Sequence, residues 1–139
     1  MKINSMNQQY YLLLAVFICG LIYTSYLWLR PVEIIDIHQD ENWSDVIVNN
    51  FPVTKSEKIS WWNKNKTFLH SKYSVPAPDK NGYFHVTFWD IGSGYKADTG
   101  TDQDSDLLCF DDMKTNANCI EKNKVFEVLR GRNGGLQYR

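Results

Sequence analysis

The stretch YYLLLAVFICGLIYTSYLWL begins at Tyr10, ends at Leu29 and contains no charged side chain. An α-helix rises about 1.5 Å per residue, so a helix of this length matches a hydrocarbon core of about 30 Å. Tyrosine and tryptophan rings near both ends suit the two membrane–water interfaces. Arg30 and Pro31 then end the apolar run. We therefore predict one transmembrane helix that contacts the lipid bilayer through residues 10–29.

Three other interpretations of this apolar segment are weaker. A cleaved signal peptide usually has a shorter apolar region followed by small residues, and no convincing A-x-A-like site is present here. A lipoprotein site at Cys19 would need a small residue before it, whereas the chain has Ile18. The remaining alternative is a buried helix of a soluble protein. An uncleaved anchor is favoured over all three.

The orientation of this anchor rests on few charges. Lys2 and the terminal amine lie on one side, and Arg30 lies on the other. Positive residues favour the cytoplasmic side, and acidic residues count for little. We expect residues 1–9 to form a short cytoplasmic tail and residues 30–139 to form a periplasmic domain. The chain would then be a single-pass protein of a bacterial inner membrane, an expectation that rests mostly on its cysteines.

The overall composition excludes some classes of partner. The chain has 139 residues, a formal net charge of −1 and an aromatic share of 14%. A balanced charge argues against nucleic acid and against an anionic lipid surface, because both require concentrated positive charge. An aromatic-rich, ordinary composition argues for a folded domain.

Cys109 and Cys119 flank the turn-rich stretch FDDMKTNAN. A disulfide between them would close a small ring, which contributes roughly 3 kcal/mol in the loop-entropy model. That would matter for a small domain in an oxidising compartment. Two reduced cysteines buried side by side are the main alternative, and a metal site would need more ligands than two thiols.

The chain after the anchor alternates between strand and helix patterns. Residues 32–38 and 44–48 read as a hairpin around Asp40, Glu41 and Asn42. Thr54 and Glu57 form a capping box for a helix from residue 55 to about residue 72. Its apolar face would comprise Ile59, Trp61, Trp62, Phe68, Leu69 and Tyr73.

The clearest strand pattern follows at residues 83–91. It places Phe84, Val86 and Phe88 on one face and further aromatic side chains on the other, which predicts a central strand covered on both sides. Shorter strands are expected at residues 107–110, 124–129 and 136–139. The predicted fold class is α+β, with a mainly antiparallel sheet packed by one amphipathic helix in ββαβββ order.

Several motifs along the chain resemble those of a known family. They are LWLRPVEI at residues 27–34, SDVIVNNFP at 44–52, KISWWNKNK at 58–66, FWDIGSGY at 88–95, and LCFDDM with CIEKNKVF between 107 and 126. The chain resembles the enterobacterial membrane protein family called domain of unknown function 943. The resemblance spans nearly the whole chain and implies a small membrane-attached protein without an established activity.

The chain departs from that family pattern in two places. Residues 97–105 look longer than the usual family counterpart, so a role for the aspartates there is hard to transfer. Family members also usually continue past the position of Arg139, so we expect part of a final hairpin to be missing. Exposed edge backbone near Leu136 would follow.

No metal or cofactor pattern stands out. Asp102, Asp104 and Asp106 resemble the opening of a calcium loop, but Leu107 and Met113 occupy the positions of the required glycine and acid. The three histidines of the chain lack metal-ligand spacing, so we expect surface or satisfied core roles for them; they are His38, His70 and His85.

The leading functional hypothesis is a tethered binding protein, and one concrete version of it is an immunity-type protein that neutralises an envelope toxin. Its expected partner is an unknown protein, and no small-molecule cofactor is predicted. Residues selected for partner binding are Trp61, Trp89, Asp90, Tyr95, Asp111 and Asp112. An assembly factor acting through its transmembrane helix is the alternative. An envelope enzyme is the weakest hypothesis, because its only catalytic candidates are Asp90, Asp111 and Asp112.

Overall fold

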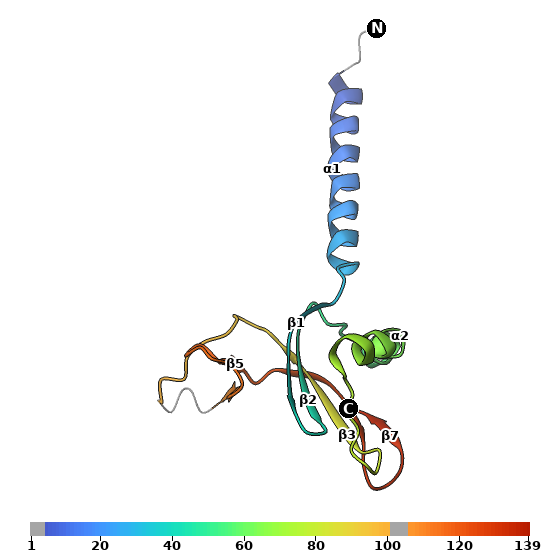
Figure 1. The fold of residues 1–139 in the computed structure, drawn as a ribbon. Helices are drawn as coiled ribbons and strands as arrows, with labels where there is room; N and C mark the ends of the chain where they lie inside the picture. Colours follow the sequence, from blue (N-terminus) through green and yellow to red (C-terminus); the bar gives the residue numbers. More distant parts are fainter. Residues whose placement is uncertain (1–4, 101–105) are drawn as a thin grey trace. The chain divides into compact units, whose positions relative to one another are not determined.

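A computed structural model describes residues 5–100 and 106–139 (Figure 1). The chain divides into an N-terminal unit that ends at Pro31 and a C-terminal unit from Val32 to Arg139. The first unit consists of one helix, and the second contains the sheet. Asp102 and Asp104, two aspartates of the run that resembles the opening of a calcium loop, lie outside the described residues.

Helix α1 (Ser5–Trp28) contains the predicted transmembrane segment except its last residue. None of its residues is buried, and its most apolar window has a mean hydropathy of 1.8. The Thr24 hydroxyl donates to the Gly20 carbonyl oxygen at 2.7 Å, so this polar group is satisfied within the helix. By length and composition, α1 is able to cross a membrane.

The main sheet of the C-terminal unit has the strand order β1-β2-β3-β6-β7. Neighbouring strands of this sheet pair antiparallel, with one exception. Strands β2 and β3 are parallel, because helix α2 connects them. The α+β class and the mainly antiparallel sheet with one packed helix are confirmed. The strands are β1 (Glu33–Asp40), β2 (Trp43–Asn49), β3 (Phe84–Asp90), β6 (Lys124–Arg130) and β7 (Leu136–Tyr138).

A β-bulge in β1 decides which of its side chains face α2. The register shifts between Ile34 and Asp36, which leaves an extra residue in β1. As a result, Ile34 and Ile37 both pack against the core on the α2 side. Asp36 and His38 therefore face the opposite side of the sheet.

Helix α2 (Lys55–Tyr73) begins at the predicted cap, where the Thr54 hydroxyl accepts a hydrogen bond from the Glu57 amide. Trp62 and Leu69 are buried against the sheet. Phe68 was expected on this apolar face, but 49% of it is exposed. Its ring instead packs edge-on against Tyr73, five positions further along the helix.

A second small sheet forms a lobe on the side of the main sheet opposite α2 (Figure 1). It pairs β4 (Leu107–Cys109) with β5 (Cys119–Glu121), and a disulfide joins the facing residues Cys109 and Cys119. Strand β5 was not predicted, and β4 pairs with it and not with the main sheet. We call residues 95–100 and 106–121 the lobe; its apolar side chains pack on Ile47 of β2.

Candidate functional site

The sheet face opposite α2 is rich in polar side chains. In β2, Val46 and Val48 join the core on the α2 side, so Trp43 and Asp45 point to the other face. The strand registers align polar residues across the sheet. One row runs Asp40–Trp43–His85, and the next runs His38–Asp45–Thr87–Glu127. We call this surface the polar face.

His38 connects the polar face to the lobe. Only 6% of it is exposed, and its ring stacks on Phe110 with centroids 3.8 Å apart. Nδ1 lies 2.8 Å from a carboxylate oxygen of Asp112, and Nε2 lies 3.0 Å from the Tyr95 hydroxyl. The Tyr95 hydroxyl donates to Asp36 at 3.1 Å. We call these five residues the His38 latch.

The electrostatics of the latch keep Tyr95 protonated. Burial raises the pKa of Tyr95, and the neighbouring carboxylates of Asp36 and Asp112 raise it further. An ionised carboxylate only accepts hydrogen bonds, so Nδ1 of His38 donates to Asp112. The lobe is thus held to β1 by an aromatic stack and a short hydrogen-bond chain.

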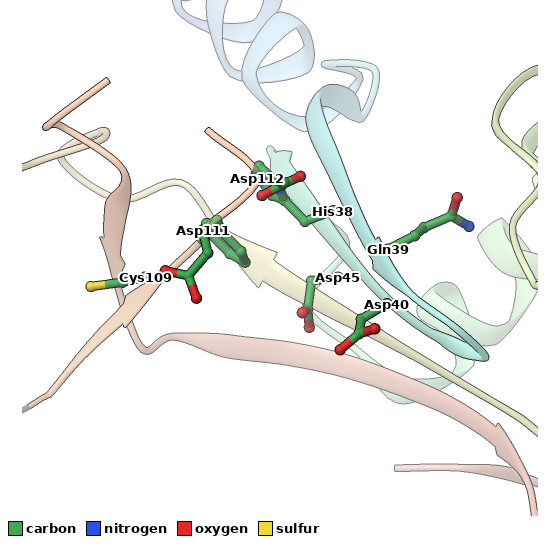
Figure 2. Close-up of a pocket in the computed structure, with 8 residues that line it drawn as sticks. His38, Gln39, Asp40, Asp45, Cys109, Asp111 and Asp112 are labelled. Carbon is green, nitrogen blue, oxygen red and sulfur yellow. The ribbon is translucent and has the colours of Figure 1, made fainter. Parts of the chain in front are cut away.

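An open cleft of about 300 Å³ lies where the lobe meets the polar face. Carboxylates dominate its lining: Asp40, Asp45, Asp111 and Asp112 contribute to it, and no lysine or arginine does. Figure 2 shows Asp40, Asp45 and Asp111 on the cleft while Gln39 points away from them. Within the described part of the chain, the Asp40 and Asp111 side chains have no hydrogen-bond or ion-pair partner. We call this the acidic cleft.

Asp45 is the half-buried member of the acidic cleft. Burial raises its pKa, although a hydrogen bond from the Trp89 indole at 2.8 Å and the charges of His38 and His85 act in the opposite direction. The fold therefore holds this carboxylate where its ionisation is disfavoured.

An exposed tryptophan, Trp43, lies across the strand pair from Asp40, which lines the cleft. Trp43 stacks on His85 with ring centroids 4.0 Å apart and keeps 55% of its surface exposed. His85 in turn forms an ion pair with the buried Glu127, which also binds the Lys124 ammonium at 3.1 Å. Burial alone would raise the pKa of Glu127, but Lys124 and His85 together lower it. This pairing fixes the ring beneath Trp43.

A family model described as "Enterobacterial putative membrane protein (DUF943)" matches residues 6–139. The chain belongs to this family. The family description and α1 together support membrane association. Comparisons with curated proteins and with solved structures found no match.

The DUF943 fold brings four of the six predicted binding residues to the lobe side of the sheet. Tyr95 and Asp112 belong to the His38 latch, Asp111 lines the acidic cleft, and Trp89 binds Asp45. Asp90 is near them but caps a turn by accepting the Gly92 amide at 3.0 Å.

Trp61 lies apart from the other predicted binding residues. It projects from α2 and packs edge-on against Phe88 and Phe51 in the core on the α2 side. The adjacent tryptophans of α2, Trp61 and Trp62, thus both pack against Phe88 in the same core. Trp61 does not line the acidic cleft.

Sequence reasoning did not select several residues of the site, among them His38, Asp40, Trp43 and Asp45. Strand alternation in β2 was the available signal, because it places Trp43 and Asp45 on the face opposite Val46. No local pattern could have joined His38 to Asp112, which follows it by 74 positions.

Residues 5–100 and 106–139 contain no group of three histidine, cysteine or acidic side chains arranged to hold a metal ion. The acidic cleft is therefore a carboxylate-lined surface, and its described residues do not form a metal-binding group.

Proposed function

We propose that this DUF943 protein is a membrane-tethered binding protein. Helix α1 anchors it in the bacterial inner membrane, and the C-terminal unit recognises a partner protein in the periplasm. The observation that supports this most is the uncovered part of the polar face, where the exposed Trp43 lies across from Asp40 of the acidic cleft. Tryptophan is enriched among residues that dominate protein interfaces. A tether would raise the effective concentration of the two partners without any chemical step.

Recognition fits the site better than catalysis. A histidine that acts as general base needs a free ring nitrogen within reach of substrate, but both ring nitrogens of His38 are engaged and the ring is buried. Asp112 is bound to His38 and Asp90 caps a turn. Among the described residues, no hydrogen-bond or ion-pair partner orients the Asp111 side chain as a catalytic group would be oriented.

A more specific version of this proposal is an immunity-type protein that neutralises a toxin delivered to the cell envelope. Its support is the small size of the chain and the acidic, aromatic surface. A strain lacking the chain should then lose viability beside toxin-producing cells, and the full chain should restore it. Unchanged survival of the deletion strain would remove this version.

The alternative is an assembly factor that acts through α1. Gly20 and Thr24 provide a small-residue pair on that helix, but the Thr24 hydroxyl already bonds within it. Replacing α1 with an unrelated transmembrane helix separates the two classes. Retained function supports recognition by the C-terminal unit, whereas lost function with normal expression supports the assembly factor.

Photo-crosslinking in living cells tests the binding proposal directly. A photoreactive phenylalanine analogue replaces Trp43 in the full chain, and a matched control carries it at Phe68. Both positions are exposed aromatics, at 55% and 49%, and they lie on opposite sides of the sheet. We expect a discrete protein adduct from position 43 only. No adduct there, or identical adducts from both positions, would contradict the proposal.

A further inference from the structure

We propose that the partner docks a basic segment on the polar face, placing an arginine side chain in the acidic cleft beside Trp43. This rests on the proposed function and adds the chemistry of the partner. The basis is charge complementarity together with an exposed aromatic ring, both fixed by the strand register.

The first step is the charge of the surface. Four carboxylates line the cleft, and no lysine or arginine of the lining balances them. The fold does neutralise acids elsewhere: Glu127 has Lys124 and His85, and Glu121 has Lys96 at 2.8 Å. Asp40 and Asp111 have no such partner in the described residues. A positively charged group on a partner would complement these two carboxylates.

The second step is geometry. Asp40 lies directly across from Trp43 in the β1–β2 register, and Asp45 follows Trp43 by two positions on the same face. Both carboxylates therefore lie beside the indole. His85 covers one face of that indole, yet more than half of Trp43 remains exposed. A cation held by the carboxylates would contact the aromatic ring as well.

These neighbours favour arginine over other cations. A guanidinium is planar, stacks on an indole and can bind two carboxylates at once, whereas lysine is a point charge. A bare metal ion is a poorer fit, because the described residues offer no metal-binding group. Arginine is also enriched at protein interfaces, where it pairs with tryptophan and acidic residues.

The test measures binding of a tetra-arginine peptide to the full chain in detergent micelles, with a tetra-citrulline peptide as the uncharged control. We expect tetra-arginine to bind more tightly and to weaken as salt rises. Asp40→Lys should reduce its affinity at least tenfold. Glu57→Lys, which makes the same charge change on α2, should change it less than about twofold.

Two further variants guard against misfolding. Asp40 and Asp111 are both exposed and have no partner in the part of the chain that the structure describes, so Asp111→Lys is a second probe that leaves the core intact. Trp43→Ala should weaken tetra-arginine more than tetra-lysine if the guanidinium stacks on the indole. Equal losses for Asp40→Lys and Glu57→Lys, or equal affinity for tetra-arginine and tetra-citrulline, would overturn the inference.

The crosslinking experiment separates failure of this inference from failure of the proposed function. If position 43 yields no adduct, the binding proposal itself fails. If it yields an adduct whose contact segment lacks arginine, and Asp40→Lys leaves that adduct unchanged, the binding proposal stands and the basic-segment inference fails.

Discussion

His38 is a single side chain on which the placement of the lobe depends. Its ring stacks on Phe110, and its two nitrogens contact Asp112 and Tyr95. It therefore connects three segments that are distant in sequence. Such buried polar networks stabilise a unique arrangement only when each member is satisfied. No buried side-chain nitrogen or oxygen in the described residues lacks a partner.

His38→Ala should therefore destabilise the C-terminal unit by about 2 kcal/mol, because it removes the stack on Phe110 and leaves the latch incomplete. Denaturant unfolding of the full chain in detergent micelles, followed by tryptophan fluorescence, measures the change. His70→Ala is the control, since His70 is exposed on α2 and should shift stability by less than about 0.5 kcal/mol. Equal effects of both variants would show that the latch contributes little.

Asp45 predicts a pH dependence of defined sign. Burial raises its folded-state pKa, so ionisation disfavours the native state and stability falls as pH rises through that raised value. Asp45→Asn keeps an oxygen for the Trp89 indole but removes the charge. The variant should match the natural chain near pH 3 and exceed it at pH 7, as measured by urea midpoints. A variant that is less stable at pH 7 would contradict the pKa direction.

At the scale of elements, α2 and the β-sheet supply the larger core. Trp62 is 3% exposed, whereas Phe68, on a neighbouring face of the same helix, is 49% exposed. Trp62→Ala should cost about 3–5 kcal/mol, and Phe68→Ala less than about 1 kcal/mol. Comparing their unfolding midpoints tests the orientation of α2. Similar losses for both variants would indicate that the helix is rotated relative to the sheet.

The β4–β5 hairpin depends on its disulfide more than on its own core. Its buried apolar residues are few, and Cys109 and Cys119 face each other across the strands. Replacing both cysteines with serine should lower stability by about 3 kcal/mol. Alkylation of denatured natural protein should label Cys19 alone until a reductant is added. Labelling of all three cysteines without reductant would mean that the bridge is absent in cells.

At the scale of the whole molecule, the proposed orientation places the C-terminal unit outside the cytoplasm. Protease added to intact spheroplasts should then digest this unit while cytoplasmic marker proteins survive. The same digestion of inside-out membrane vesicles should spare it. The opposite pattern would reverse the topology, and the proposed periplasmic partner would have to be abandoned.

The sequence alone determined the apolar anchor, the order of the principal strands and the helix cap at Thr54. These features depend on local composition and periodicity, which are visible in single segments. It also selected Tyr95 and Asp112 among the candidate binding residues, but it gave no reason to place them beside His38.

Only the tertiary structure decided the site. A bulge in β1 turns His38 toward the lobe, and strand register places Asp40 and Asp45 beside Trp43. Pairing between distant strands sets these contacts, and that pairing leaves no mark in local sequence. It also separated Trp61 from the other predicted binding residues, because packing on one side of a sheet or the other depends on the whole fold.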